Sequence, residues 1–462
     1  MFDFSKLTLG VVTTRRDTFP SVEKAIAKND VILERISGIL DGIDNLDIVN
    51  ASDVVPGGLI CELSETRKVI EYFKEKKVEA ILMLHANFGQ EEAVGRLCSA
   101  LNVPVLLWGP RDGAKDSDEG FRDGDTQCGM FASTRALLRL GVPFTYAENT
   151  WIDGVEIENE IKDFVRVASV VRAFRNMRIL QIGSRPRQFL SVKINESELM
   201  EKFGFELTTI ETTIMAAEAE KVYENKKDEI YALLDQISDK YDFSDVPTEN
   251  KERIMSFVIA IKDLAEHYDC TTVACECWNV PYFVNKMKIG GCLTFAILED
   301  LGITVSCECD VNGAVSAAIA RGAARGDSAA FFADVTVRHP YNDNAELMWH
   351  CGRYPASVSK NSVVKADGAG RLCHELKEGD ITMIRFDADK GTYYLFADEG
   401  RGIEGPETSG AYVWLETESW PKWEKKLMYG PYIHHMAGVY GKYKEIIREA
   451  TKYFDVQFDC AT

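Results

Sequence analysis

The sequence predicts an α/β fold in which two doubly wound parallel-sheet domains precede a small C-terminal β-barrel-like domain. Short apolar runs alternate with amphipathic stretches through the first part of the chain, and the same alternation restarts at Met177. From about Ala329 onward, strand-like segments follow one another at short spacing instead. Because 462 residues exceed one ordinary core, we expect domains at residues 1–170, 171–328 and 329–462.

The expected first domain alternates strands with helices, as βαβ units do. Crossovers of this length predict a parallel sheet that is covered on both faces. The expected strands are Leu9–Thr13, Leu46–Asn50, Ala80–Leu84, Val103–Trp108 and Pro143–Tyr146. The expected helices are Ser21–Leu40, Glu65–Lys76, Glu91–Leu101 and Thr126–Leu140.

The expected second domain repeats this α/β pattern, and the third is rich in strands. The strands of the second domain are expected at Arg178–Ile182, Glu206–Ile210, Thr271–Cys275 and Thr304–Cys307. Its helices are expected at Glu196–Phe203, Tyr223–His267 with a break near Phe243–Pro247, and Val311–Ala324. The third domain has expected strands at Phe331–Arg338, Leu347–Cys351, Ile381–Phe386, Thr392–Ala397 and Ala411–Leu415, and a closing helix at Tyr440–Tyr453.

Charge and hydropathy limit the compartment and the partners that we expect. The formal net charge of −20 would repel a phosphate backbone, so we do not expect nucleic acid as a partner. No apolar stretch reaches the roughly 18 residues of a membrane span, and the first residues do not resemble a signal peptide. These observations predict a soluble cytoplasmic protein without a membrane partner, whose 12 cysteines are mostly reduced thiols.

Carboxylates that follow two expected central strands are the first candidates for chemistry. Glu276 follows the run TTVAC, Asp310 follows TVSCEC, and Glu308 precedes Asp310 by two residues. The carboxyl ends of parallel strands meet at one edge of a sheet, where ligands gather. A carboxylate in this position is also often a helix N-cap, and Asp310 is well placed to cap the helix Val311–Ala324. Both interpretations remain open at this stage.

Histidines strengthen the prediction of a metal site. His434 and His435 are adjacent, and on a strand they would point to opposite faces, so we expect one of them to bind a given ion. His350 lies in the segment MWHCGRYP. Carboxylates combined with imidazoles suit a divalent ion such as Mn²⁺, Co²⁺ or Mg²⁺. The alternative is that these histidines are half-buried structural residues.

Several segments resemble the L-fucose isomerase and L-arabinose isomerase-like family of metal-dependent aldose–ketose isomerases. The run CECDVNGAVSAAI is similar to a family segment in which an acid and an aspartate precede Asn-Gly and a small-residue helix. GSRPRQF resembles the turn that opens the second domain of these proteins, and HHMAGVYG resembles a paired-histidine segment. MWHCGRYP and GDTQCGMFASTRALLRLGVP also resemble family segments, in the same order along the chain.

This resemblance implies a three-domain subunit, a divalent ion that is usually manganese, and a hexamer or trimer with sites between subunits. The implied metal ligands are Glu276, Asp310 and either His434 or His435, with His350 nearby. Glu276 and Asp310 are also the candidates for proton transfer through an ene-diolate, although a hydride shift is an open alternative. The expected substrates are L-fucose, L-arabinose, another 6-deoxy sugar, or a sugar with an anionic C6 group such as a sulfonate.

Further residues are candidates for contact with the sugar. Arg15 and Arg16 follow the first expected strand and could bind hydroxyls or a terminal anion. His85 and Gln90 in LHANFGQEE could form the wall of a neighbouring subunit's site, and Trp278 could stack on a sugar face. His350 and Glu308 complete this expected set of substrate-binding residues, which is Arg15, Arg16, His85, Gln90, Trp278, Glu308 and His350.

Two other functions are compatible with the pattern. One is a catalytically silent or regulatory sugar-binding protein on an isomerase fold, for which all of the metal-type residues would not be needed. The other is a metal-dependent epimerase or aldolase that passes through a similar enediol. The dinucleotide fingerprint GxGxxG and the phosphate loop GxxxxGK[ST] are both missing, so we do not expect a nucleotide cofactor.

Overall fold

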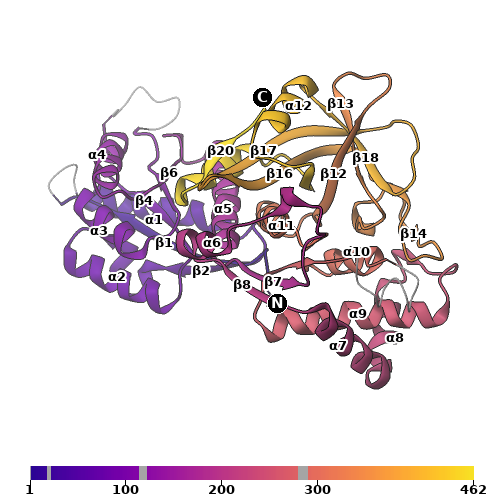
Figure 1. Cartoon of the computed structure of the whole chain (residues 1–462). Helices are drawn as coiled ribbons and strands as arrows, with labels where there is room; N and C mark the ends of the chain where they lie inside the picture. The colour runs from indigo at the N-terminus through magenta and orange to yellow at the C-terminus, as the bar shows by residue number, and fades with distance from the viewer. Residues whose placement is uncertain (1, 18–21, 114–121, 279–289, 462) are drawn as a thin grey trace. The chain divides into compact units, whose positions relative to one another are not determined.

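The computed structural model describes residues 2–17, 22–113, 122–278 and 290–461 (Figure 1). The chain divides into two compact units. We call Ser5–Arg172 the N-terminal unit, and Met1–Phe4 together with Ala173–Thr462 the C-terminal unit. Within the described ranges, no helix has both the length and the apolar character needed to span a membrane.

The N-terminal unit contains a parallel sheet with strand order β2-β1-β4-β5-β6, and β3 pairs with β1 beside this path. The strands are β1 Leu7–Thr14, β2 Leu46–Asn50, β3 Leu59–Ile60, β4 Ala80–His85, β5 Val105–Trp108 and β6 Thr145–Tyr146. The helices are α1 Val22–Leu40, α2 Leu63–Glu75, α3 Glu91–Leu101, α4 Thr126–Arg139 and α5 Val155–Arg175. The expected doubly wound arrangement is therefore present here.

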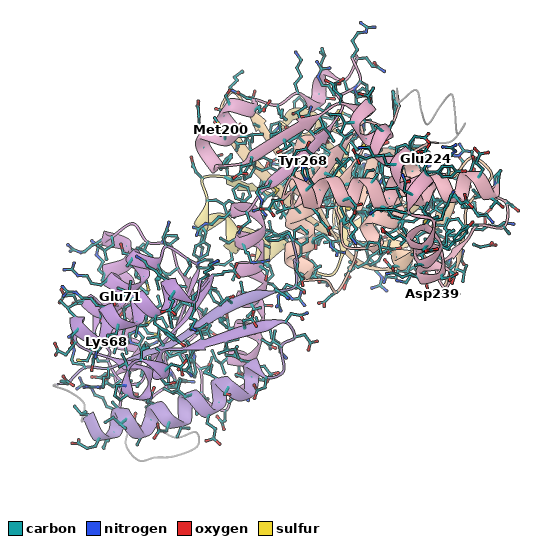
Figure 2. The ribbon with its side chains drawn as sticks, turned by 90° about the horizontal axis from the view of Figure 1, so that it is seen from below. Lys68, Glu71, Met200, Glu224, Asp239 and Tyr268 are labelled. Atoms are coloured by element: carbon teal, nitrogen blue, oxygen red, sulfur yellow. The ribbon has the colours of Figure 1, made fainter. Side chains whose placement is uncertain are left out.

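Apolar cores lie on both faces of this sheet. Ile32 and Ile36 of α1 pack with Phe164 of α5 in one core, and residues of α2, α3 and α4 form the other core. The α2 helix shows how the sequence places one face inward, because Val69 and Phe73 are four residues apart and both buried. Lys68 and Glu71 are exposed on α2 and point away from the sheet (Figure 2).

Most expected elements of this unit are confirmed to within a few residues, and two were not predicted. The first residue of the expected helix Ser21–Leu40 lies outside the described residues. The long helix α5 was not predicted, because its acidic first turns and valine-rich second half mask the helical period. The two-residue strand β3 is too short to give a periodic signal.

The C-terminal unit begins with a four-stranded parallel sheet of order β11-β10-β7-β8. Its strands are β7 Arg178–Ile182, β8 Glu206–Ile210, β10 Thr272–Cys275 and β11 Val305–Ser306. The helices of this part are α6 Glu196–Phe203, α7 Thr212–Asn225, α8 Lys227–Ile237, α9 Thr248–His267, α10 Cys292–Asp300 and α11 Val311–Ala324. The expected helical segment Tyr223–His267 is thus three helices, of which the first begins earlier, and α10 was not predicted.

The rest of this unit is a closed antiparallel β-barrel. Strands β18, β13, β12, β19, β16 and β17 follow one another, and pairing of β17 with β18 closes the ring. The main strands are β12 Phe331–Arg338, β13 Ala345–His350, β16 Gly379–Asp389, β17 Thr392–Ile403, β18 Ala411–Thr417 and β19 His435–Tyr440. The short elements are β9 Tyr241–Asp242, β14 Val364–Lys365, β15 His374–Glu375, β20 Gln457–Asp459, α12 Trp420–Tyr429 and α13 Lys444–Ala450.

The expected closing helix Tyr440–Tyr453 is wrong in its first part. Tyr440 is the last residue of the barrel strand β19, and α13 covers only Lys444–Ala450 before a 3₁₀ turn. Gly441, which has a φ of +126°, separates the strand from the helix. The barrel needs β19 to join β12 to β16, and this pairing overrides the helical pattern of the sequence.

Helix α11 connects the parallel sheet to the barrel. It packs against β10 and β11 of the sheet and against β16 and β19 of the barrel. All of its residues except Arg321 are buried, which explains its small residues. One core extends from the sheet helices to Phe332 of β12, Val364 and Leu372, so both parts form one unit. The start of α11 is therefore held between the parallel sheet and the barrel.

Gly129 of α4 offers a test of how the N-terminal unit packs. A Cβ atom at Gly129 would lie 1.6 Å from the carbonyl oxygen of Phe88, in the loop after β4. A backbone carbonyl cannot move aside as a flexible side chain can. We therefore expect Gly129→Ala to destabilise this unit by about 3 kcal/mol or more. Gly38 of α1 has open space around it, and Gly38→Ala should stabilise by about 0.5–1 kcal/mol. Hydrogen exchange of the β4 amides measures the stability of both variants. Equal protection in Gly129→Ala and Gly38→Ala would contradict the close packing of Gly129 against the Phe88 carbonyl.

Candidate functional site

Asp310 is the most completely bonded carboxylate of the candidate set. It caps α11, where its Oδ1 accepts from the backbone N–H of Gly313 at 3.0 Å. Arg385 of β16 donates to Oδ2 at 2.5 Å and to Oδ1 at 3.3 Å. His435 of β19 donates from Nδ1 to Oδ2 at 2.9 Å. All four acceptor positions of Asp310 are therefore occupied.

The charges around Asp310 keep it ionised. Its side chain is fully buried, and burial alone would raise its pKa. The buried Arg385 and the hydrogen bond from His435 outweigh this effect and hold the pKa of Asp310 well below its usual range. Since an ionised carboxylate can only accept, the proton of the neutral His435 ring lies on Nδ1 and leaves Nε2 with a free lone pair.

A second acid extends this network on the far side of Arg385. Arg385 donates from Nε to Asp387 at 2.9 Å, and Asn312 donates from Nδ2 to the other Asp387 oxygen at 3.1 Å. Arg385 itself is fully buried. The network therefore joins Asn312, Asp387, Arg385, Asp310 and His435 by direct contacts.

The free nitrogen of His435 faces a carboxylate that sequence reasoning missed. Asp334 lies opposite His435 in the β12–β19 pairing, and its Oδ1 lies 3.4 Å from His435 Nε2. The same oxygen lies 3.9 Å from His434 Nε2 and has no hydrogen-bond partner although it is buried. Asp334, His434 and His435 are a set that could hold a metal ion. The only sequence signal for Asp334 is an acid inside the apolar strand run FFADV.

The donor set fits a divalent cation. Asp334 Oδ1 and His435 Nε2 are both acceptors, so at 3.4 Å they need a cation or a proton between them. Adjacent ligands of an octahedral ion with bonds of about 2.1 Å lie about 3.0 Å apart, which is close to this separation. Carboxylate and imidazole donors together suit Mn²⁺ or Co²⁺. The donor types of Asp334, His434 and His435 therefore fit a divalent ion of the predicted kind.

Glu308 enters the same neighbourhood through an unusual turn. Glu308 and Cys309 both have a left-handed backbone, with φ of 54° and 53°, which is costly for residues with a Cβ. The turn buries Glu308 next to Cys277, and its Oε2 has no hydrogen-bond partner. Burial raises the pKa of Glu308, His350 opposes that rise, and Asp334 adds to it. Glu308 is thus within electrostatic reach of both residues.

His350 and Glu276 complete the polar surroundings. The backbone N–H of Cys351 donates to His350 Nδ1 at 2.9 Å, so the neutral ring carries its proton on Nε2, which is buried without a partner. His350 is therefore poised to donate, as expected for a substrate-binding residue. Glu276 is 9% exposed, and its Oε2 accepts a long hydrogen bond of 3.5 Å from the Ser184 N–H. This carboxylate is therefore only weakly hydrogen-bonded.

Aromatic rings stand beside these polar groups. Phe189, in the loop after β7, packs edge-on against Trp278 with ring centroids 5.0 Å apart, and its centroid lies 6.2 Å from that of His435. Trp278 is 47% exposed, which leaves a face for a ligand. Gly183 allows Glu276 to approach, because a Cβ on its left-handed backbone would lie 2.9 Å from Glu276 Oε2. Phe189 was not predicted from the sequence.

The N-terminal unit gathers the other predicted contacts at one edge of its sheet. The Arg16 guanidinium lies 3.6 Å from the centroid of the Phe88 ring, and Arg15 forms an ion pair with Asp17. The Gln90 N–H donates to Thr14 at 3.0 Å. The carboxyl ends of β1 and β4 meet at this edge, as predicted.

His85 contacts the loop at this edge, and its Nε2 has no partner among the described residues, so the predicted substrate contact stays a prediction. Its ring is fully buried and donates from Nδ1 to the Phe88 carbonyl at 3.1 Å. Burial lowers the pKa of His85 to about 4, so the ring is neutral near pH 7. His85 therefore shapes the loop that presents Phe88 rather than offering an exposed polar group.

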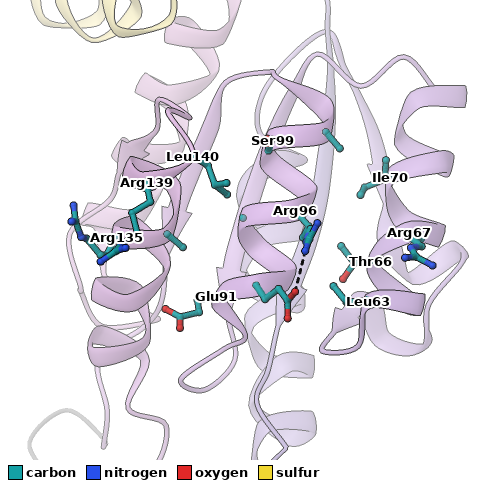
Figure 3. Close-up of a pocket in the computed structure, with 14 residues that line it drawn as sticks. Leu63, Thr66, Arg67, Ile70, Glu91, Arg96, Ser99, Arg135, Arg139 and Leu140 are labelled. Carbon is teal, nitrogen blue, oxygen red and sulfur yellow. Dashed lines mark hydrogen bonds and ion pairs between the residues drawn. The ribbon is translucent and has the colours of Figure 1, made fainter.

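A large groove on the N-terminal unit contains none of these residues. It has a volume of about 1020 Å³ and lies between α2, α3 and α4. Arg67, Arg96, Arg135 and Arg139 border it above an apolar floor that includes Leu140 (Figure 3). Arg96 pairs with Glu92 at 3.4 Å. Its carboxylates are Glu91 and Glu92, and no histidine lines it, so the groove does not combine carboxylates with imidazoles as the predicted chemistry requires.

Comparisons with known proteins match both ends of the chain to one kind of enzyme. Residues 10–175 match the family model of the fucose/sulfoquinovose isomerase N-terminal domain, and residues 325–461 match that of the L-fucose isomerase C-terminal domain. The chain is 23% identical to the sulfoquinovose isomerase of Priestia megaterium over 419 residues, which are 88% of this chain and 91% of that protein.

Other relatives agree with this match. A sulfoquinovose isomerase of Alkalicoccus urumqiensis is 23% identical over 71% of this chain and 73% of its own length. Among solved structures, a solute-binding protein of Bacillus halodurans with bound myo-inositol covers 70% of this chain and 91% of that chain at 12% identity. Its TM-score of 0.16 is too low to bear on the fold.

The geometry gives Asp310→Asn a specific expected outcome. Asparagine caps helices as well as aspartate does, so α11 should stay in place. The charge that fixes the His435 ring would be lost, and removing such a partner typically weakens metal binding by about 10–100-fold. Titration of Mn²⁺ into the folded variant, followed by electron paramagnetic resonance, measures this loss. Unchanged affinity would restrict Asp310 to capping α11.

Proposed function

Because the chain belongs to the fucose isomerase-like family, we propose that it is a metal-dependent aldose–ketose isomerase that acts on a C6-anionic sugar such as sulfoquinovose. The observation that carries the metal site is the contact between Asp334 Oδ1 and His435 Nε2, two acceptors 3.4 Å apart. The relatives named sulfoquinovose isomerase, which this chain matches over most of its length, support the choice of substrate.

We assign the ion to Asp334, His435 and His434, with Glu308 and Glu276 as further candidate carboxylates. Manganese is the expected ion, and cobalt or magnesium are alternatives. When bound, the ion would polarise the sugar carbonyl and stabilise negative charge that develops on oxygen. Asp310 would act by positioning the His435 ring, since its Oδ2 accepts from His435 Nδ1 at 2.9 Å.

Proton transfer is assigned to the two carboxylates that are not saturated by hydrogen bonds. Glu276 has one long hydrogen bond, and Glu308 has an oxygen without a partner. One of them removes the C2 proton of the open-chain aldose, and the other, or the same group, delivers a proton to C1 of the ene-diolate. His350 donates from Nε2 to a sugar oxygen, and the exposed face of Trp278 stacks on the sugar.

Arg187 is the residue that we assign to the anionic group of the sugar. It lies in the loop after β7, between Ser184, whose N–H approaches Glu276, and Phe189, which lies beside His435. The Arg187 side chain is exposed, and its guanidinium has no ion pair or hydrogen bond with any residue that the structure describes. Arg185 is less available, because its Nη1 already donates to the carbonyls of residues 186, 187 and 189.

The assembly is also a proposal. The edge of the N-terminal unit that carries Arg16, Phe88 and Gln90 presents a cation and an aromatic ring together, as sugar-binding surfaces do. We propose that this edge completes the site of a neighbouring subunit in a trimer or hexamer. The protein acts on a small molecule, and its charge of −20 argues against nucleic acid.

The isomerase reaction can be tested directly. The Mn²⁺-loaded protein should convert sulfoquinovose to its ketose, and treatment with a chelator should abolish turnover until Mn²⁺ or Co²⁺ is returned. In deuterium oxide, an ene-diolate route places deuterium at C1 of the ketose, whereas a hydride shift does not. NMR of the product reads both results. Full turnover of chelator-treated protein would refute the metal mechanism, and binding without turnover would favour the silent sugar-binding alternative.

Substrate recognition gives a separate prediction for Arg187→Gln. Loss of a hydrogen bond to a charged group costs about 1.5–3 kcal/mol, so KM for sulfoquinovose should rise about 10–100-fold while kcat changes little. The KM for L-fucose, which lacks the anionic group, should not change. Lys221→Ala serves as a control for charge, since Lys221 pairs with Glu218 on the exposed face of α7. Equal effects on both sugars would remove Arg187 from anion recognition.

A further inference from the structure

A small polar pocket lies in the C-terminal unit, next to the hydrogen-bond network of the candidate site, with which it shares Asn312 and Asp387. It has a volume of about 240 Å³, and its wall comes from the segment before and within α6, from the start of α11, and from the β16–β17 hairpin. The polar side chains of this wall are Lys193, Asn195, Glu198, Asn312, Asp387, Lys390 and Tyr393. None of the residues that we assign to the metal, to proton transfer or to the sugar lines this pocket.

The charges of the pocket favour an anion. Its two carboxylates already have partners, because Glu198 accepts from the Tyr393 hydroxyl at 3.0 Å and Asp387 forms an ion pair with Arg385 at 2.8 Å. The ammonium groups of Lys193 and Lys390 have no ion pair or hydrogen bond within the described part of the chain. Two unpaired ammonium groups at one pocket are notable in a chain with 73 acids and 53 bases.

Asn312 adds a specific requirement for a hydrogen-bond donor. Its side chain is 4% exposed, and its Nδ2 donates to Asp387 at 3.1 Å. Its Oδ1 is buried and has no partner among the described residues. An unsatisfied buried acceptor costs about 1–3 kcal/mol, and a hydroxyl group in the pocket would recover this cost. The pocket therefore calls for a molecule that combines hydroxyl groups with negative charge.

We propose that this pocket binds a small hydroxylated organic anion, of the size of a three-carbon phosphate or sulfonate, as an effector of the enzyme. About ten non-hydrogen atoms fit within 240 Å³ with room for water. The lysines bind the anionic group, and Asn312 Oδ1 accepts from a hydroxyl. This site is distinct from the one that binds the sugar.

The effector role follows from the network that begins at Asn312. Asn312 and Arg385 share Asp387, Arg385 holds Asp310, and Asp310 orients His435. A ligand that bonds to Asn312 alters the hydrogen bond from Asn312 to Asp387. This changes how strongly Arg385 interacts with Asp387 and with Asp310, and so changes the strength of the hydrogen bond between Asp310 and His435. By linkage, the bound metal then changes the affinity of the effector by the same factor. This part of the inference rests on the proposed metal site, whereas binding in the pocket does not.

The binding test uses the full chain and sn-glycerol 3-phosphate as the probe. Isothermal titration calorimetry should show saturable one-to-one binding, weaker binding of inorganic phosphate and none of glycerol. Lys193→Ala combined with Lys390→Ala should weaken binding of the probe at least about tenfold, which corresponds to about 1.4 kcal/mol. Lys221→Ala, the matched surface control, should not change it. No saturable binding, or equal binding to the double variant, would overturn the proposal, since the second result places the probe elsewhere.

Coupling to the candidate site is read from the metal rather than from turnover. The dissociation constant of Mn²⁺, measured by electron paramagnetic resonance, should shift at least about fivefold when sn-glycerol 3-phosphate is saturating. The double lysine variant should lose this shift. An unchanged constant with the probe bound would overturn the effector role. Failure of the isomerase assay with intact probe binding would refute the proposed function and leave this site standing.

Discussion

The rest of the C-terminal unit depends on the buried ion pair between Asp310 and Arg385. Both side chains are fully buried, and two charges without water around them are costly unless every hydrogen-bonding position is filled. Here the positions of Asp310 are filled from three elements, by Gly313 of α11, Arg385 of β16 and His435 of β19. The pair therefore joins the helix that follows the parallel sheet to two barrel strands. The sheet and the barrel cannot move apart without exposing or orphaning these charges.

Asp310 has a full set of hydrogen-bond partners, and this explains why neighbouring polar groups lack partners. Because Asp310 accepts the hydrogen bond from His435 Nδ1–H, the Nε2 lone pair of the neutral ring faces Asp334, and two acceptors meet. Glu308 is held in a left-handed turn with one oxygen unpaired. Such groups reduce stability, and folded proteins keep them where a ligand completes them. The contrast between one saturated acid and several open ones is the observation from which we propose their different roles.

Regular elements were predicted where a strong local pattern agreed with the tertiary structure. The strand Arg178–Ile182 and the helix Glu196–Phe203 have the predicted bounds, because their apolar periods match the faces that they bury. The helix Val311–Ala324 also has its predicted bounds, although it is buried nearly all round, because its run of small residues indicated it. Helix α10 was missed because nearly all of its residues are buried, which removes the amphipathic period. The helix expected from Tyr440 failed because strand pairing in a barrel is a non-local interaction that no local window contains.

The sequence by itself determined the kinds of chemistry that are available and the strand ends where they gather. Glu276, Glu308 and Asp310 could be found there because parallel strands deliver their carboxyl ends to one edge. Only the tertiary structure decided which of them is free to bind or react. Arg385 lies 75 positions from Asp310 and His435 lies 125 positions away. In the sequence, a carboxylate that caps a helix looks the same as a carboxylate that binds a metal ion. The two differ in whether distant residues already donate hydrogen bonds to the carboxylate oxygens. That depends on how the barrel closes over α11.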